Sequence, residues 1–321
     1  MKTSRSSNAV SPQSRTADGG ESILRHLFTV SRPHQWSKNL FVLAPLLFSR
    51  SLGDHHALTN ACIAFACFCL ASSAIYVVND IQDAHADRLH PLKRRRPIAA
   101  GRLSPATAWA WAVLLTAGSL ALAQSLGVQV LALCGTYLIL MLGYCFHLKR
   151  VVILDAILIA GGFVIRVAGG AAAIAVAPSH WLIICAFLLA LYLAFAKRRQ
   201  EMLTLSDAAG HRSALSAYTL PFLEQVNTIL LAALLLSYAL YTVAPETIAR
   251  CGTDLLVYGT LFVLYGLLRY LHLIQTAGNG GDPGKLLVSD KPLAATVAGW
   301  TVYNASIIYR AEVMHFLERL F

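Results

Sequence analysis

The stretch 57–87 reads ALTNACIAFACFCLASSAIYVVNDIQDAHAD, and it decides the fold class. Residues 57–79 contain no Asp, Glu, Lys or Arg side chain. A run of about 20 mostly apolar residues is what an α-helix needs to cross the hydrocarbon core of a bilayer. This run ends in aspartates at positions 80, 83 and 87. The sequence therefore predicts a spanning helix that carries an acidic motif at the membrane surface.

Eight further apolar runs of similar kind flank this helix. The whole chain is 57% hydrophobic and 13% charged, whereas soluble domains carry about 25% charged residues. We therefore predict an all-α polytopic membrane protein with nine transmembrane helices. The first predicted span is the least regular, because Pro45 interrupts it. The nine spans cover residues 37–51, 57–79, 106–124, 127–147, 151–176, 180–196, 219–243, 254–275 and 292–316.

The basic residues predict the orientation in the membrane. If the N-terminus is cytoplasmic, 20 of the 26 Lys and Arg residues fall in cytoplasmic segments, and only four fall outside. Cytoplasmic loops of membrane proteins carry such an excess of Lys and Arg. We therefore expect a cytoplasmic N-terminus, an external C-terminus and cytoplasmic cap loops at 80–105, 197–218 and 276–291. Chemistry is expected on this cytoplasmic side.

Two further expectations follow from composition. The first 22 residues are polar and rich in serine, and they lack the apolar segment of a signal peptide. We predict a disordered cytoplasmic tail at 1–22 and a single transmembrane catalytic domain at 23–321. The formal net charge of +10 could indicate nucleic-acid binding. Because the basic residues lie between long apolar runs, we expect no nucleic-acid partner.

The acidic motif predicts a metal site. Asp80, Asp83 and Asp87 are spaced i, i+3 and i+7, which places them on one face of a helix. Three carboxylates repel one another, and a bound cation would offset that repulsion. Mg²⁺ takes oxygen ligands, typically one or two carboxylates, and completes its shell with water and substrate phosphates. We expect all three aspartates to be metal ligands and catalytic residues.

A basic loop follows the motif and includes Lys93, Arg94, Arg95 and Arg96. Four consecutive cations beside three carboxylates suit an anionic ligand whose charge is shared by a metal and by the loop. The alternative is that the loop is a topological anchor on anionic lipid headgroups.

A second polar cluster is predicted where spans four and five meet. Tyr144, Lys149 and Arg150 lie at this turn, and Asp155 follows about one turn into the next span. Arg166 comes 11 residues later, on the same stripe and about 16 Å further along the helix axis. Ionisable residues inside a membrane are costly and point to function, although a structural pair with a neighbouring helix is the alternative.

Besides the segment from Asp282 to Lys291 before the ninth span, two more polar segments are expected on the same side of the membrane. One opens the first span and contains Arg32, Gln35, Trp36, Lys38 and Asn39. The other closes the sixth span as Lys197, Arg198, Arg199, Gln200 and Glu201.

Together these residues resemble the UbiA superfamily of intramembrane prenyltransferases. That family has nine helices and an NDxxDxxxD motif that binds Mg²⁺-diphosphate, which corresponds here to Asn79, Asp80, Asp83 and Asp87. A second family element corresponds to Tyr144, Lys149, Arg150 and Asp155. One departure stands out, because the family's second aspartate-rich motif is replaced by the basic segment 197–201.

The finer resemblance is to a phosphoribosyltransferase branch of this superfamily. It rests on RPHQWSKN at 32–39, NDIQDAHADRLHPLKRRRPIAAG at 79–101 and GFVIRVAGG at 162–170. The resemblance implies Mg²⁺-dependent transfer of phosphoribose from 5-phosphoribosyl diphosphate (PRPP) to a polyprenyl phosphate such as decaprenyl phosphate. It also implies diphosphate release, inversion at the ribose C1, a bacterial plasma membrane location and a role in making an arabinose donor for the cell envelope.

The resemblance also implies a set of residues. Asn79 joins the three aspartates as catalytic, and the expected substrate-binding residues are Gln35, Lys38, Asn39, Lys93, Arg96, Tyr144, Lys149, Arg150, Asp155, Arg166, Lys197, Arg198 and Glu201. Membrane lipids are expected partners, and a homo-oligomer is left open. Two alternatives remain: a prenyltransferase that moves a prenyl group onto an aromatic acceptor, and a transporter or lipid flippase.

Overall fold

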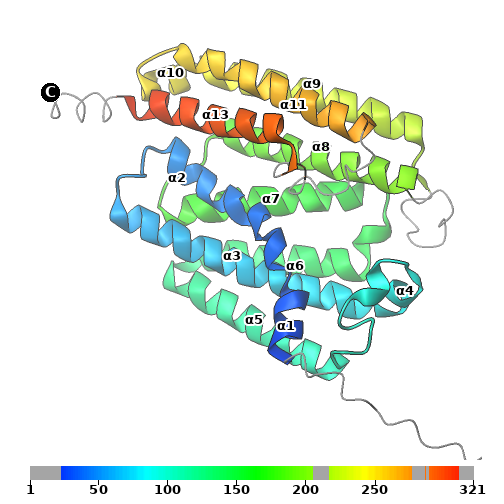
Figure 1. The fold of residues 1–321 in the computed structure, drawn as a ribbon. Coiled ribbons are helices and arrows are strands. Elements are labelled where there is room, and N and C mark those ends of the chain that lie inside the picture. Colours follow the sequence, from blue (N-terminus) through cyan, green and yellow to red (C-terminus); the bar gives the residue numbers. More distant parts are fainter. Residues whose placement is uncertain (1–22, 205–216, 277–285, 287–288, 311–321) are drawn as a thin grey trace, which may run out of the picture.

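The structure is a computed structural model that describes residues 23–204, 217–276, 286 and 289–310. The described residues form helices and connecting turns, with no β-strand among them. Figure 1 shows the helices running side by side as a bundle. Their bounds are α1 Ile23–Ser31, η1 Pro33–Leu43, α2 Ala44–Phe48, α3 His55–Gln82, α4 Ala84–Leu89, η2 Lys93–Arg95, α5 Pro105–Ser125, α6 Val128–Phe146, η3 Leu148–Arg150, α7 Leu154–Ala173, α8 His180–Thr204, α9 Leu220–Val243, α10 Pro245–Cys251, η5 Leu255–Tyr258, α11 Gly259–Thr276 and α13 Lys291–Ile308.

Seven helical segments of the described chain are long and apolar enough to cross a membrane. They confirm the predicted spans from the second to the eighth. The first predicted span is broken, because it begins as the 3₁₀ helix η1 and continues in the short α2, with Pro33 and Pro45 near their starts. The ninth corresponds to α13, which ends at Ile308, and residues beyond 310 lie outside the described chain. Nine spans therefore remain a prediction, as does the tail at 1–22, which also lies outside it.

The bundle has two halves that meet at α7. In one half α3 packs against α5 and α6. In the other half α8 packs on α9, α9 on α11 and α11 on α13. The helix α7 packs on both α6 and α8. The segment η1 lies across α3 and α7, so the residues just after α1 are held against the helix that carries the acidic motif.

Two glycines let η1 and α3 approach α7 closely. A Cβ atom on Gly170 would lie 1.8 Å from the Val42 carbonyl oxygen, and one on Gly169 would lie 2.5 Å from the Phe68 ring. At these two positions the neighbour is protein.

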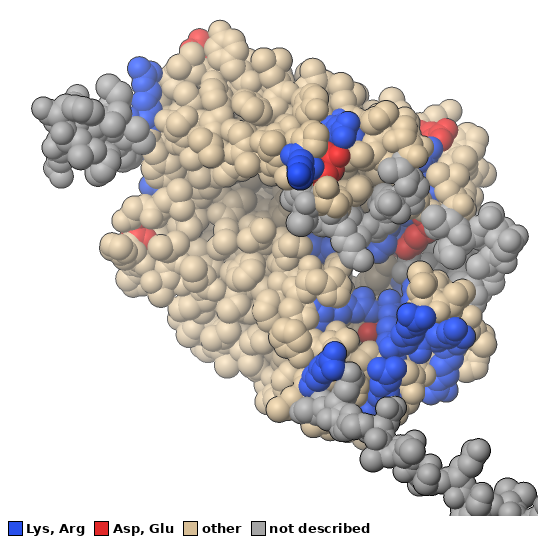
Figure 2. Space-filling view, viewed as in Figure 1, with Lys and Arg blue, Asp and Glu red and all other residues tan. Residues whose placement is uncertain are grey.

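The charged side chains gather at one end of the bundle. Figure 2 shows most of the visible Lys and Arg residues around the end where α3 passes into α4, while the flanks of the helices are largely uncharged. The acidic motif and the basic loop that follows it are therefore brought to the same end of the molecule.

Candidate functional site

The acidic motif lies where α3 ends and α4 begins. Asp80 is the third residue from the end of α3, Asp83 separates the two helices, and Asp87 lies in α4. All three carboxylates are paired with cations. Arg32 and Arg96 both donate to Oδ1 of Asp80, with the Arg96 bond at 3.0 Å, and Arg96 also donates to Oδ2 of Asp87 at 2.6 Å.

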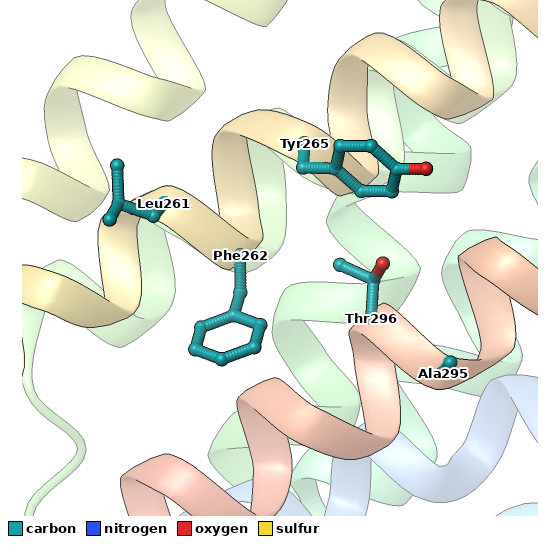
Figure 3. A pocket seen from close by; sticks show the side chains of 5 residues that line it. All are labelled: Leu261, Phe262, Tyr265, Ala295 and Thr296. Carbon is teal, nitrogen blue, oxygen red and sulfur yellow. The ribbon is translucent and has the colours of Figure 1, made fainter.

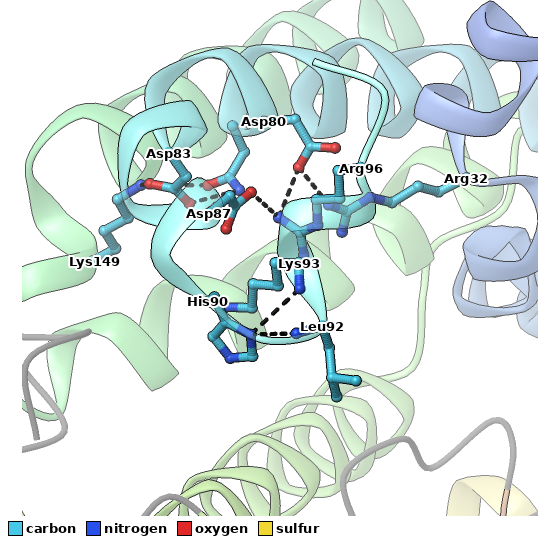
Figure 4. Close-up of polar contacts among 10 residues, drawn as sticks. Arg32, Asp80, Asp83, Asp87, His90, Leu92, Lys93, Arg96 and Lys149 are labelled. Carbon is cyan, nitrogen blue, oxygen red and sulfur yellow. Dashed lines mark hydrogen bonds and ion pairs between the residues drawn. The ribbon is translucent and has the colours of Figure 1, made fainter. Parts of the chain in front are cut away.

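Asp83 has a different set of partners. Its Oδ1 accepts from Lys149 Nζ at 2.6 Å, and its Oδ2 accepts from Asn79 Nδ2 at 2.9 Å. Lys149 also reaches Asn79 Oδ1 at 3.4 Å. Figure 4 shows Lys149 reaching Asp83 from one side, while Arg32 and Arg96 reach Asp80 from the other. The motif is therefore divided into two ion-paired groups.

Burial separates the aspartates further. The Asp83 side chain is 30% exposed, whereas those of Asp80 and Asp87 are 3% and 5% exposed. In the described part of the chain no three His, Cys, Asp or Glu side chains are grouped closely enough to hold a metal ion by themselves. Asp83 and Asn79 are both half-buried and together offer oxygen atoms as ligands. This donor set fits Mg²⁺, which takes one or two carboxylates and draws other ligands from water and substrate phosphates.

The basic loop is held by hydrogen bonds between side chains and backbone groups. His90 Nδ1 accepts from the backbone N–H of Leu92 at 3.2 Å and of Lys93 at 3.3 Å. Arg88 Nε donates to the Ala99 carbonyl at 3.3 Å, which ties α4 to the end of the loop. The loop therefore holds Lys93 half-buried beside the acidic motif, as drawn in Figure 4.

Arg166 lies inside the membrane-spanning part of α7 and is 5% exposed. Its Nε donates to Asn39 Oδ1 at 2.7 Å and its Nη2 donates to the Tyr137 hydroxyl at 2.8 Å. Asn39 in turn donates to the Ser72 hydroxyl at 3.1 Å. The structure thus brings together two predicted residues, Asn39 and Arg166, and supplies Tyr137 as a partner that the sequence prediction had not included.

Asp155 and Arg198 form a buried pair in the other half of the bundle. Arg198 Nε donates to Asp155 Oδ2 at 2.8 Å, and Nη1 of the same arginine lies 3.5 Å from Glu201 Oε2. The Tyr218 hydroxyl donates to Asp155 Oδ1 at 2.9 Å, and burial raises the pKa of Tyr218 to about 12. Tyr218 therefore stays protonated as a donor at neutral pH. This geometry matches the alternative reading of Asp155 as one partner of a structural pair.

The other predicted residues lie around these groups. Gln35 and Lys38 are half-buried on η1, Lys197 is half-buried on α8, and Arg150 is exposed at the end of η3. Tyr144 lies near enough to Arg198 to interact with it electrostatically.

Three residues of the site were not among the expected catalytic and substrate-binding residues. The Tyr137 hydroxyl accepts from the buried Arg166, and the Tyr218 hydroxyl donates to the buried Asp155. Arg32 lies at the junction before η1 with its guanidinium 5.1 Å from the centre of the Tyr76 ring. Arg32 opens the RPHQWSKN stretch, so its place in that motif is the signal that could have included it. For Tyr137, the signal is a tyrosine within an apolar run, because its hydroxyl needs a polar partner and can face a buried arginine.

One hollow lies apart from these charges. It is lined by Leu261, Phe262 and Tyr265 of α11 and by Ala295 and Thr296 of α13, which Figure 3 labels. Its volume is about 430 Å³. Its walls carry little polar surface, and it contributes no charged group to the site.

Comparison with known proteins identifies the family of the chain. The sequence profile described as the UbiA prenyltransferase family matches residues 40–285. The chain is 34% identical to the decaprenyl-phosphate phosphoribosyltransferase of Corynebacterium glutamicum, over 93% of this chain and 89% of that protein. It is 32% identical to the protein of the same name from Mycolicibacterium smegmatis, over 92% and 96%.

A solved structure shows the same fold. The UbiA homologue from Archaeoglobus fulgidus, bound to GPP and Mg²⁺, matches with a TM-score of 0.70 at 18% identity, over 88% of this chain and 99% of that one. The profile match and the two bacterial relatives lead to one assignment: the chain is a multi-pass membrane enzyme that belongs to the UbiA prenyltransferase family.

Proposed function

We propose that the chain transfers 5-phosphoribose from PRPP to a polyprenyl phosphate, releases diphosphate and requires Mg²⁺. The observation that carries this proposal is the excess of cations at the acidic motif. Each aspartate is already neutralised by Arg32, Arg96 or Lys149, and Lys93 lies beside them. PRPP carries a phosphate as well as a diphosphate, and the acceptor carries a third phosphate. Such substrates need more cations than a prenyl diphosphate beside a neutral aromatic ring.

The relatives support the same substrates, since both are named decaprenyl-phosphate phosphoribosyltransferases. We further propose that the site faces the cytoplasm and that the N-terminus is cytoplasmic. The uneven distribution of Lys and Arg between the connecting segments supports this orientation. Production of an arabinose donor for the cell envelope is part of the same proposal.

The chain's own residues would position the donor and the metal ion. Lys149 and Arg96 would donate to oxygens of the donor, and Asn79 and Asp83 would provide the Mg²⁺ ligands. When bound there, Mg²⁺ would offset the negative charge of the diphosphate and make it a better leaving group. The acceptor phosphate is already anionic, so no residue needs to act as a strong general base. Attack from the face opposite the diphosphate gives inversion at the ribose C1.

A donor assay tests the proposal. Purified protein in detergent is incubated with Mg²⁺, a polyprenyl phosphate and PRPP labelled in the ribose, and label is measured in the lipid fraction. We expect label that depends on Mg²⁺, that is lost in Asp83→Ala and that persists in Arg250→Gln, a change at an exposed position of the short helix α10. If the lipid stays unlabelled while a prenyl diphosphate is transferred to an aromatic acceptor, the proposal is wrong.

A further inference from the structure

Arg32 has an unusual backbone conformation for a long side chain. It lies between α1 and η1 with φ 50° and ψ 59°, in the left-handed region. Residues other than glycine are uncommon there and persist where surrounding contacts hold them. The contacts at Arg32 are an ion pair with Asp80 and a cation–π contact with Tyr76. Both come from α3, so the strained junction is held against the helix of the acidic motif.

The Asp80 carboxylate joins two arginines that are far apart in the sequence. Its Oδ1 accepts from Arg32 and from Arg96 Nη1, and that same Nη1 donates to Asp87. The four residues form one chain, Arg32–Asp80–Arg96–Asp87. Its carboxylates are almost fully buried, whereas the side chains of Arg32 and Arg96 are 20% and 25% exposed.

Arg96 has N–H groups that none of these contacts uses. An arginine has five N–H donors in a planar fork, and the side-chain hydrogen bonds of Arg96 to described residues use only Nη1. Its Nε and Nη2 are thus available to an anion at the exposed edge of the site. Asp80, by contrast, presents its paired oxygen to two guanidinium groups and is 3% exposed.

From this chain of contacts we infer that Arg32 is a positioning residue for the donor phosphates. It acts through Asp80, and the shared carboxylate fixes the Arg96 guanidinium with its remaining N–H groups directed to a phosphate. Arg32 itself does not contact the substrate. This inference rests on the proposed function, because it assigns Arg96 to the phosphates of the donor. In this inference the role of Asp80 is to bind the guanidinium groups of Arg32 and Arg96.

The test is a double-mutant cycle, with Mg²⁺ and inorganic diphosphate as the probe. Binding is measured by calorimetry for the wild type, Arg32→Asn, Asp80→Asn and the double variant. Asparagine tolerates the left-handed conformation, so Arg32→Asn removes the cation with least change to the backbone. We expect Arg32→Asn to weaken diphosphate binding about tenfold, and to have no further effect when Asp80 is already Asn. Arg32→Lys, which keeps a cation, should recover part of the loss.

Kinetics separate this inference from a general loss of structure and from failure of the proposed function. Arg32→Asn should raise the KM for PRPP and leave the KM for the polyprenyl phosphate unchanged. Additive losses in the binding cycle would mean that Arg32 contacts the ligand directly, and equal changes in both KM values would mean a general structural role; either result overturns the inference. A wild-type protein that binds diphosphate but never uses PRPP overturns the proposed function, while the binding cycle still decides the role of Arg32.

Discussion

Lys149 Nζ lies 2.6 Å from Asp83 Oδ1, so the turn between α6 and α7 supplies the cation for the most exposed carboxylate of the acidic motif. The two residues are 66 positions apart in the sequence. Lys149 would compete with a metal ion for the oxygens of this carboxylate, so binding of Mg²⁺ at Asp83 would favour departure of the ammonium group. On leaving Asp83, the same ammonium group would be close to the phosphates that accompany the metal.

This geometry predicts opposite effects of one substitution on two ligands. Lys149→Met should strengthen the binding of Mg²⁺ alone, because no ammonium group competes for Asp83. It should also raise the KM for PRPP about 10- to 100-fold, which corresponds to the loss of a charged hydrogen bond to phosphate. Calorimetry with Mg²⁺ and steady-state kinetics measure the two effects. Lys149→Arg is the control, because it keeps a cation. If Lys149→Met weakened the binding of both Mg²⁺ and PRPP, the transfer of Lys149 from Asp83 to the phosphates would be contradicted.

Substitution of Asp83 and substitution of Asp80 should differ in their effect on the Mg²⁺ requirement. Asp83→Asn replaces an exposed carboxylate that lies beside Asn79, and we expect the Mg²⁺ concentration for half-maximal activity to rise at least about tenfold. Asp80→Asn removes a buried partner of Arg32 and Arg96, so its main effect should be on the KM for PRPP. A Mg²⁺ titration of both variants checks this. Equal shifts in the Mg²⁺ requirement would mean that Asp80 is a metal ligand as well, as the sequence predicts.

Much of this site could be predicted from the sequence because its signals are local. The spacing of the aspartates and the basic loop that follows α3 are both read within 25 consecutive residues, and both lie at one end of the bundle. The pairing of these charges could not be predicted in the same way. Which cation meets which carboxylate depends on the path of η1 over α3 and on the turn after α6.

The broken first span also could not be predicted from the local sequence. Hydropathy predicted a helix at 37–51, but the chain forms a 3₁₀ helix that packs on α3 and α7. Asn39 is fully buried on this segment and bonded to Arg166, so tertiary contacts with an intramembrane arginine stabilise a conformation that the local apolar pattern does not favour. Single-residue hydropathy carries no information on such a partner.

Replacement of Arg198 should destabilise the fold strongly. Arg198→Met leaves the carboxylate of Asp155 buried without its cation, which typically costs about 3–5 kcal/mol. Arg199→Met is a matched control on the next residue of α8, since the Glu224 partner of Arg199 is 48% exposed and can be solvated. Thermal unfolding in detergent should show the larger loss for Arg198→Met. The double variant Asp155→Leu with Arg198→Met should recover stability, and no recovery would contradict the structural pairing.

Two glycines of α7 should respond in opposite ways to a single methyl group. At Gly170 the new Cβ would lie 1.8 Å from the backbone oxygen of Val42, so Gly170→Ala must displace η1, at a cost of about 3 kcal/mol or more. At Gly161 the nearest side-chain atom is 3.7 Å away, and alanine favours a helix by about 1 kcal/mol over glycine. Gly161→Ala should therefore be neutral or stabilising. Comparable losses of thermal stability in both variants would contradict the close approach of η1 to α7.

Asn227 offers a substitution that should increase stability. It is 2% exposed in α9, and neither its amide nitrogen nor its amide oxygen has a hydrogen-bond partner among the described residues. A buried polar group without a partner costs about 1–3 kcal/mol, and leucine is a better helix former of similar size. Asn227→Leu should raise the unfolding temperature in detergent without changing either KM. Asn304→Leu is the contrasting control, because its side chain is also buried but bonds to Tyr238 and to the Trp300 carbonyl, so the same change should lower the unfolding temperature. A destabilised Asn227→Leu would show that this amide has a partner in the folded protein and that α9 needs it.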